Sequence, residues 1–484
     1  MKMPKLSALA VALILTGCAS APDYKQPSNA LTETFLNQSV EGVHSGHNLE
    51  GQLTNAHWWS QFDDPMLNQL IEDAQNQSIP LKVASERIKS AQAFNRIVES
   101  FKVPTVNLGA GYTSYGISDN DPLLGAAVSS NNPLGTALID SDQSAFHAGM
   151  TIAWELDLFG RIDNQAKAAS IRAEQAEIMR QGLTTLITSD VIHNYLQYRG
   201  AQERKAIALD LVNDQQQTLE LVEKVHRSGY GSQLDVARAK AMLAATKAVI
   251  PQLETAENAH QQRLAILLGE SPSAMQSRLN AISPLPAFNG VIPTGLPSDL
   301  LQRRPDLQIA EREMAAQNAE LAAAVANQYP KFYLTGSPGV LANDFDDLFN
   351  SNSSTWLASI GVSWNIFDGG RTDAMIKLQE SRFEASALSY QHAVNSAIGE
   401  VETLLNGYGN SQQYQALISE AKSETDTAVG KAISLYRAGL IDYLTVLDAQ
   451  RQQHAMRDRE VAARLQTANM VVGLNKALGG DWEM

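Results

Sequence analysis

The stretch RSGYGSQLDVARA (Arg227 to Ala239) decides the fold, because it recurs in altered form as RAGLIDYLTVLDA (Arg437 to Ala449). Gly229 and Gly439 lie 439 − 229 = 210 residues apart. A long helical pattern runs into each glycine and another runs away from it, which is typical of a helical hairpin with a tight turn. We therefore predict two helical hairpins.

The same offset relates further residues on both sides of the two turns, without a gap. It pairs Trp154 with Trp364, Gly160 with Gly370, Arg161 with Arg371, Tyr198 with Tyr408, Leu234 with Leu444 and Gly269 with Gly479. A fixed offset of this kind is the signature of an internal repeat. We interpret the chain as a tandem duplication.

The helices that enter the turns are unusually long. From Arg161 to Arg227 is 67 residues without a proline, which is about 100 Å of helix, and Arg371 to Arg437 repeats it. Small, apolar and polar residues follow 3,4 spacing before each turn, which indicates coiled-coil packing. They are Ala208, Leu211, Gln215, Thr218, Val222 and Val225 in the first copy, and Ile418, Ala421, Thr425, Ala428, Ala432 and Leu435 in the second.

The helices that leave the turns are predicted from Gln233 to Leu268 and from Asp442 to Leu478. Pro251 should kink or break the first of them, because proline removes a backbone donor and clashes with the preceding turn. Shorter helices are expected after Pro65, from Pro80 to Phe101, and from Pro305 to Gln328.

Alternating patterns predict four strands, two in each half of the chain. The first half has them around Val106 to Tyr112 and Phe146 to Trp154, and the second half around Phe332 to Gly336 and Trp356 to Trp364. Strands of about ten residues suit an outer membrane barrel. The connections, Ser114 to Ser144 and Pro338 to Ser354, are predicted to be loops outside the membrane.

Four strands cannot close a barrel, and an open sheet edge is not tolerated in lipid. The missing strands must therefore come from other copies of the chain. Three copies give twelve strands, although a dimer with eight is also compatible with the sequence. No stretch after the N-terminus reaches the roughly 18 consecutive apolar residues of a membrane helix.

Composition and the N-terminus indicate an exported protein that does not bind nucleic acid. The 484 residues carry a formal net charge of −15, which disfavours nucleic acid because phosphate binding needs clustered cations. Lys2 and Lys5, followed by the apolar run from Leu6 to Leu15, are typical of an export signal. Cys18 is the only cysteine, so no intramolecular disulfide can form.

The predicted organisation has five parts. Residues 1–17 form a lipoprotein signal peptide, residues 18–56 a lipidated N-terminal tether, residues 57–270 the first structural repeat, residues 271–300 a Pro-rich crossover, and residues 301–484 the second repeat.

In this order, a set of short motifs resembles the TolC-like outer membrane efflux channel family, within it the lipoprotein (NodT-type) subfamily. The motifs are Cys18 with Pro22-Asp23-Tyr24, Trp58-Trp59 through Asp64-Pro65, Trp154-Glu155-Leu156-Asp157-Leu158-Phe159-Gly160-Arg161, Leu300 through Leu307, Trp364 with Phe367 through Arg371, and both turns. The resemblance covers nearly the whole mature chain.

The resemblance implies an α+β membrane protein, a homotrimer. Its twelve-stranded outer membrane β-barrel, with four strands per chain, continues into a long α-helical coiled-coil tunnel through the periplasm. Cys18 would be the lipidated first residue, and Ala19 after it favours the outer membrane as its location. The partners would be outer membrane lipid, a periplasmic adaptor (membrane fusion) protein and an inner membrane pump of the RND type. The function would be gated exit of drugs or other toxic small molecules, without catalysis or a cofactor.

The resemblance also assigns roles at the turns. Adaptor docking would use Gly229, Ser232, Leu234, Gly439, Leu440 and Leu444, and the periplasmic gate would use Asp448, Asp235 and Tyr436. Three copies of Asp448 would form an acidic ring. The competing interpretations are residues that only turn the chain, and an ordinary solvated aspartate near a helix start. Thr445 and Ile441 stand where some relatives have an aspartate and an arginine, so closure would use partly different contacts.

Other chemistry finds little support in the sequence. The nine histidines are scattered, and His44 and His47 lie in the tether. Asp344, Asp346 and Asp347 lack the spacing of a calcium loop. We therefore expect no metal site. The alternative functions are a duct for metal ions or secreted proteins, and a non-transport structural lipoprotein with soluble coiled coils.

Overall fold

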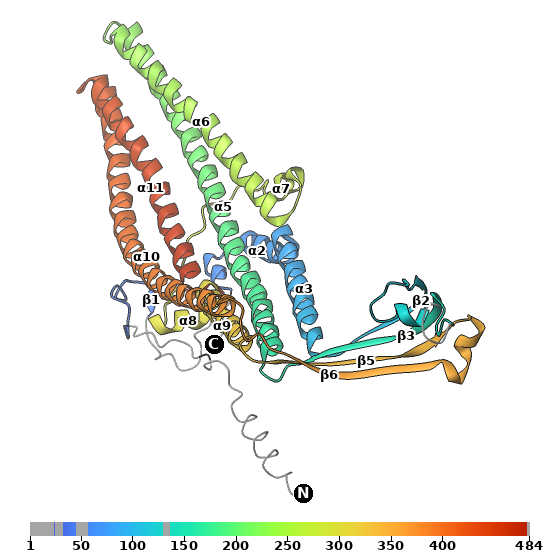
Figure 1. Ribbon diagram of the computed structural model, residues 1–484. Coiled ribbons are helices and arrows are strands. Elements are labelled where there is room, and N and C mark those ends of the chain that lie inside the picture. The colour runs from blue at the N-terminus through green and yellow to red at the C-terminus, as the bar shows by residue number, and fades with distance from the viewer. Residues whose placement is uncertain (1–23, 25–31, 45–56, 129–135, 482–484) are drawn as a thin grey trace. The chain divides into compact units, whose positions relative to one another are not determined.

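The structure is a computed structural model that describes residues 24, 32–44, 57–128 and 136–481 (Figure 1). The chain divides into two compact units. One, the strand unit, comprises residues 1–26, 90–173 and 312–387; the other, the hairpin unit, comprises residues 27–89, 174–311 and 388–484. Each unit therefore contains residues from both predicted repeats.

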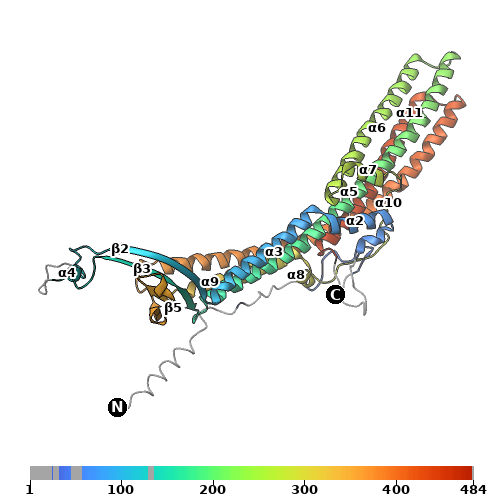
Figure 2. The same cartoon turned by 90° about the vertical axis from the view of Figure 1, so that its right-hand side faces the viewer.

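The strand unit is built on one antiparallel sheet. Its strands are β2 (Thr105–Gly116), β3 (Asp142–Leu156), β5 (Lys331–Ala342) and β6 (Ser354–Ser363), in the order β2-β3-β5-β6. All four are labelled in Figure 1, and Figure 2 shows β2 beside β3. These are the four predicted strands, each somewhat longer than or equal to the predicted ten residues.

The register gives the sheet two different faces. Pairs such as Val106 with Ile152, Trp154 with Leu334, and Leu334 with Ile360 place large apolar side chains on one face. The other face carries small and polar residues, including a 2.7 Å contact between the hydroxyls of Thr335 and Ser359. Because side chains alternate along a strand, this division follows directly from the alternating sequence pattern.

The second predicted loop begins too early. β5 continues past Gly336 to Ala342 and contains Pro338, a residue that the sequence pattern predicts at the start of the loop. The ladder between β3 and β5 is paired at Gly336 and again at Gly339, but not at the two residues between them. Since proline cannot donate a backbone hydrogen bond, the strand tolerates Pro338 where this ladder is interrupted.

Two tryptophans tie strand ends to the chain in the same way in both halves. Nε1 of Trp154 donates to the carbonyl of Lys102 over 3.0 Å, and Nε1 of Trp364 donates to the carbonyl of Gln328 over 2.9 Å. The duplication seen in the sequence thus extends to individual hydrogen bonds. The remaining short elements of the unit are η2 (Ser100–Lys102), α4 (Gly125–Val128), η4 (Asp346–Phe349) and η5 (Ser351–Ser353).

Two helical hairpins dominate the hairpin unit. The first pairs α5 (Arg161–Arg227) with α6 (Gln233–Leu268), and the second pairs α10 (Arg371–Arg437) with α11 (Tyr443–Ala477) (Figure 1). α5 and α10 begin in the strand unit. No helix within the described ranges is long and apolar enough to cross a membrane.

The prediction of a helix break at Pro251 is wrong. α6 is helical on both sides of Pro251 and through it. Thr246 and Leu253 are both buried on either side of the proline, so packing holds the helix across the one hydrogen bond that proline removes.

Shorter helices pack against the hairpins. α2 (Pro65–Gln77) buries the predicted apolar stripe, Leu67, Leu70, Ile71 and Ala74. The others are η1 (Trp58–Phe62), α3 (Ile79–Glu99), α7 (Pro272–Arg278), η3 (Pro297–Asp299), α8 (Leu300–Arg303) and α9 (Pro305–Ala326). α3 and α9 are shared between the two units.

Residues 32–44 of the predicted tether belong to the hairpin unit and pack within it. β1 (Val43–His44) pairs in parallel with β4 (Ile292–Pro293), which lies in the predicted crossover. Phe35 is buried in the main apolar core, and the backbone N–H groups of Leu36 and Asn37 donate to Glu402. The tether is therefore anchored before the first helix begins.

Candidate functional site

The two turns have the same backbone geometry. Gly229 has φ +84° and Gly439 has φ +72°, as the sequence predicts for left-handed turn residues. The N–H of Tyr230 donates to the carbonyl of Val225 over 3.2 Å, and the N–H of Leu440 donates to that of Leu435 over 3.0 Å. These hydrogen bonds, from an N–H to the carbonyl five residues earlier, are typical of a Schellman motif. Donor and acceptor in the second turn each lie 210 residues after their counterparts in the first.

Each helix that follows a turn is capped by a pair made of one hydroxyl residue and one aspartate. In the first turn the hydroxyl residue is the cap and the aspartate lies three residues later, whereas in the second turn the order is reversed. Oγ of Ser232 accepts from the N–H of Asp235 over 3.1 Å, and the Asp235 carboxylate accepts from the Ser232 hydroxyl over 2.7 Å. In the second turn Asp442 is the cap: it accepts from the N–H of Thr445 over 3.0 Å and from its hydroxyl over 2.7 Å. Both caps satisfy a free helical N–H group, but the charged residue is the third helical residue in the first turn and the cap residue itself in the second.

The two hairpins pack against each other behind the turns through a small apolar cluster, which we call the tip core. It comprises Leu219, Val222, Val236, Ala239, Leu243, Ala432, Tyr443, Val446 and Leu447, all buried. α5 and α6 contribute the first five residues and α10 and α11 the others. The turns are therefore held together as one structure.

The structure brings two of the three predicted gate residues together. Burial and the nearby Asp235 carboxylate raise the pKa of Tyr436. Burial, Tyr436 and Asp235 together raise the pKa of Tyr443 to about 12, and the two tyrosine rings lie 5.9 Å apart between centroids. Asp235 from the first hairpin thus faces two phenols of the second.

The third predicted gate residue, Asp448, lies elsewhere. Its side chain is exposed on α11, and within the described ranges it makes no hydrogen bond or ion pair. Asp448 is not part of the Asp235–Tyr436 group in a single chain.

Arg238 is a residue that sequence reasoning missed. Its guanidinium Nη1 lies 3.5 Å from Oδ1 of Asp235, one turn away on the same helix. Its positive charge also lowers the pKa of Asp442, after the larger effect of the hydrogen bonds from Thr445. The i,i+3 spacing predicts the first contact, but nothing in the sequence places Arg238 near the second turn.

The predicted docking residues present apolar surface. Leu234, Leu440 and Leu444 are 56%, 70% and 46% exposed, and Tyr230, which was not among the predicted docking residues, is 91% exposed. A Cβ added at Gly229 or Gly439 would meet nothing within 4 Å, so the outer surface of both turns is open. Exposed apolar residues clustered at one end of a molecule are typical of an interaction surface.

The two coiled-coil seams differ. All of the predicted first seam is buried or half-buried in the chain. In the second seam Ala432 is buried, whereas Ala428 and Leu435 are exposed and Val429, outside the predicted seam, is buried. The second seam is therefore only partly correct.

A polar seam joins α5 to α11 further from the turns. Nε2 of Gln450 donates to the hydroxyl of Thr218 over 3.1 Å, and the side chains of Gln215 and His454 meet over 2.7 Å. Burial, and to a lesser degree Arg457, lowers the pKa of His454 to about 4. The histidine is therefore neutral, and its Nε2 accepts from the Gln215 amide.

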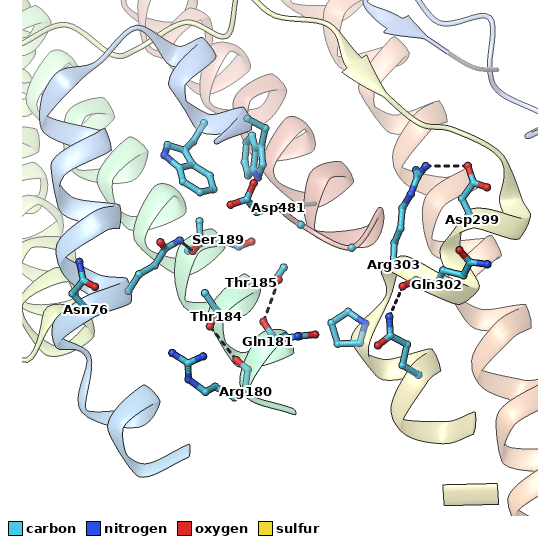
Figure 3. Close-up of a pocket in the computed structure, with 18 residues that line it drawn as sticks. Asn76, Arg180, Gln181, Thr184, Thr185, Ser189, Asp299, Gln302, Arg303 and Asp481 are labelled. Atoms are coloured by element: carbon cyan, nitrogen blue, oxygen red, sulfur yellow. Dashed lines mark hydrogen bonds and ion pairs between the residues drawn. The ribbon is translucent and has the colours of Figure 1, made fainter. Parts of the chain in front are cut away.

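A cavity of about 800 Å³ in the hairpin unit is lined by none of the predicted site residues. Figure 3 shows it lined by polar side chains of α5, α8 and their neighbours. The hydroxyls of Thr184 and Thr185 donate to backbone carbonyls of their own helix, and Arg303 pairs with Asp299 over 3.1 Å. These side chains already use their hydrogen bonds within the protein.

Two further sequence predictions concern lipid attachment and metal binding. Cys18, the predicted lipid attachment residue, lies outside the described residues, as does the predicted signal peptide. Among the residues that are described, no three His, Cys, Asp or Glu side chains are grouped so as to hold a metal ion.

Comparison with known proteins connects this architecture to one family. The family model described as "Outer membrane efflux protein" matches residues 70–270 and 296–480, so each matched stretch lies largely in one predicted repeat.

Two curated relatives match along almost their whole length. The solvent efflux pump outer membrane protein SrpC of Pseudomonas putida is 30% identical, covering 100% of this chain and 99% of its own. The cation efflux system protein CusC of Escherichia coli O6:H1 is 28% identical, covering 99% of each chain.

Among solved structures, the outer-membrane channel OprN has a TM-score of 0.87 and 31% identity, covering 96% of this chain and 99% of its own. The predicted fold class is confirmed: the described residues form a four-stranded sheet and two long helical hairpins, with an internal duplication, in the arrangement of an outer membrane channel.

Proposed function

The chain belongs to the outer membrane efflux protein family, and on this premise we propose that it is the gated exit duct of a tripartite system that exports toxic small organic molecules. It is an outer membrane efflux channel that extends into the periplasm. In the proposal an inner membrane pump of the RND type supplies the energy, a periplasmic adaptor joins pump to channel, and the channel itself catalyses no reaction.

The edges of the sheet support a trimer. β2 and β6 each have a strand neighbour on one side only. An unpaired edge in lipid leaves backbone donors and acceptors unsatisfied, at a cost of several kcal/mol per group. Three chains joined edge to edge give twelve strands and no free edge. The apolar face, on which Leu108, Trp356 and Ile360 are exposed, would then contact lipid.

The observation that carries adaptor docking is the shared form of the two turns. Both have a glycine with open space around it, and both expose leucines beside it. We assign docking to Gly229, Ser232, Leu234, Gly439, Leu440 and Leu444. The tip core behind the turns would hold the two turns at a fixed position relative to each other while an adaptor binds.

The contacts between the hairpins support a gate at the same end. The tip core joins the first hairpin to the second, and Asp235 of the first hairpin is close enough to Tyr436 of the second to raise its pKa, so we place both residues in the closed mouth. Asp448 has no partner among the described residues of its own chain, which leaves it available to form an acidic ring with the copies in two other chains.

The gate assignment is tested by conductance in planar bilayers. Asp448→Ala should increase the current and weaken block by divalent cations, whereas Asp344→Ala, in the β5–β6 connection, should change neither. An Asp448→Ala channel with unchanged current and unchanged cation block contradicts the assignment.

Lipid attachment at Cys18 completes the proposal. Two or more acyl chains give a stable anchor, since each buried methylene adds about 0.8 kcal/mol. Labelling with a radioactive fatty acid should be lost in Cys18→Ser. Equal labelling of both proteins would rule out this anchor.

The exported class is tested by growth of a deletion strain. SrpC is named for solvent efflux and CusC for cation efflux, so relatives of similar identity bear the names of different cargoes. We expect the deletion strain to become sensitive to hydrophobic drugs and solvents, and the wild-type gene to restore resistance. Sensitivity to metal ions alone would instead favour the metal-ion duct.

A further inference from the structure

The strand unit has two cavities at positions that the duplication relates, although Tyr333 lines both of them. The first, about 360 Å³, is lined by Glu155, Arg161 and Gln165 among others. The second, about 250 Å³, is lined by Asn365, Arg371 and Met375 at the positions 210 residues later. Both cavities lie where a strand ends and a long helix begins.

The arginine of the first cavity has an internal partner. Nη2 of Arg161 lies 2.9 Å from each carboxylate oxygen of Glu155, and Nε lies 3.2 Å from Oε1. Both side chains are about four-fifths buried. The first cavity is therefore electrically balanced by its own residues.

The second cavity has kept the arginine and lost the carboxylate. Asn365 stands where the first copy has Glu155, and within the described part of the chain Arg371 forms no ion pair. Lys331 lines the same cavity and is likewise without an ion pair there. The cavity thus has two cations and no acidic side chain in its lining.

The nearest carboxylate does not replace Glu155. Asp368 accepts from the N–H and hydroxyl of Thr372 and from the N–H of Gly370, so it caps α10. Arg371 is close enough to lower the pKa of Asp368, but the two do not approach within 4 Å as an ion pair.

The cavity opens on the polar face of the sheet. Lys331, Tyr333 and Ser363 lie on the same face as Thr335 and Ser359, opposite the apolar face. In a barrel whose apolar face contacts lipid, this is the face that lines the water-filled interior. A ligand would therefore reach the cavity from the aqueous side.

We propose that the cavity around Arg371 and Lys331 is a binding site for an oxyanion, a carboxylate or phosphate group of a soluble molecule in the channel. The planar guanidinium of Arg371 can hold two oxygens at once, and the ammonium of Lys331 adds a second charge-assisted hydrogen bond. The Asn365 amide supplies donors where Glu155 supplies an acceptor in the first cavity. This site is independent of the roles proposed for the turns.

Pyrophosphate is a suitable probe, with binding measured by calorimetry on the purified full-length channel in phospholipid-free detergent. Arg371→Gln removes one cation, and Asn365→Glu introduces the internal partner that the first cavity has. Each should weaken binding at least about tenfold, because each removes a charge-assisted hydrogen bond to the anion. Arg382→Gln, an exposed arginine further along α10, is the matched control and should bind like the wild type.

The first cavity allows the reciprocal experiment. Glu155→Gln leaves Arg161 without its carboxylate and should allow pyrophosphate to bind there, but more weakly than in the second cavity, because Arg161 is the one cation among the residues lining the first cavity. The assembly state of every variant is checked on a gel, so that a loss of binding is assigned only to folded channels.

Three results would overturn the proposal. One is a wild-type channel that does not bind pyrophosphate. Another is equal binding by Arg371→Gln and Arg382→Gln. The third is pyrophosphate binding by Asn365→Glu that equals binding by the wild type. Competition by phosphatidylglycerol in nanodiscs would overturn the assignment to a soluble anion in favour of a lipid headgroup.

Discussion

Nε2 of Gln215 lies 2.7 Å from Nε2 of His454, so two half-buried or buried side chains join α5 to α11 across the two hairpins. The imidazole must be neutral to accept this hydrogen bond. Its pKa, lowered to about 4 by burial, keeps it neutral at physiological pH.

This contact predicts a pH dependence of stability. The pKa of His454 is about 4 in the folded protein and 6.5 as its ordinary value. Between these values the unfolded chain binds more protons, so stability is complete above about pH 6.5 and falls as the pH approaches 4. The loss should be about 1–2 kcal/mol per chain after allowance for partial solvent screening.

The measurement is thermal unfolding of the purified channel at pH 7.5 and at pH 5. His454→Gln keeps a hydrogen-bonding side chain but does not titrate, so it should show a smaller fall between the two pH values. An identical fall in both proteins would assign the pH dependence to other groups.

Gly439→Leu should abolish efflux without removing the protein from the outer membrane. The residue has φ +72°, which costs a side-chain-bearing residue about 1–2 kcal/mol, and the added side chain projects into the open space proposed for docking. Resistance in a complemented deletion strain is the measurement.

Gly430→Ala is the control for that change. Gly430 lies inside α10, and a Cβ there also meets nothing within 4 Å, so alanine should be neutral or stabilise the helix by about 0.5–1 kcal/mol. If Gly439→Leu keeps full resistance, neither the turn geometry nor its open surface is needed for docking.

Arg238→Ala should loosen the proposed closed state. The guanidinium pairs with Asp235 and also favours the charged form of Asp442, so it links the two turns electrostatically. We expect larger single-channel currents and greater sensitivity of cells to vancomycin. Lys240→Ala is the matched control, because Lys240 pairs with Glu223 inside the first hairpin only. Equal effects of the two substitutions would contradict a specific role for Arg238.

Substitutions at Asp442 and Thr445 can separate the effect of the negative charge from the effect of helix capping. Asp442→Ala should lower the thermal midpoint, since the N–H of Thr445 loses its acceptor. The double variant Asp442→Ser with Thr445→Asp copies the first turn, so it should restore the midpoint while moving the aspartate from the cap residue to the third helical residue. Efflux is then compared between the double variant and the wild type. Lower efflux in the double variant would assign a role to the position of the charge, whereas equal efflux would mean that Asp442 acts only as a helix cap.

Sequence patterns predicted the helices and the turns closely, because their causes are local. The boundaries of α5 and α10 at Arg161, Arg227, Arg371 and Arg437 follow from an uninterrupted helical pattern and a glycine just beyond it. The alternation of apolar and polar residues likewise predicted which side chains share a face of the sheet.

The errors arose where tertiary contacts overrode local signals. Pro338 is typical of a loop, yet it lies within β5 beside an interrupted ladder, and Pro251 lies within an intact helix held by packing. The contacts of Gln215 with His454 and of Arg238 with the second turn join helices far apart in the sequence, so they depend on a relative rotation of helices that no local pattern contains.

The exchanged caps have a consequence for symmetry. In a trimer the six turns would share one backbone shape and would look like a sixfold ring to a partner that sensed shape alone. Because the charged residue is Asp235 at the third helical position in one turn and Asp442 at the cap position in the other, the charge pattern of that ring repeats only three times. A single partner guided by charge can therefore dock in three equivalent orientations rather than six. If six partner molecules bind, one to each turn, they occupy two kinds of site that alternate around the ring.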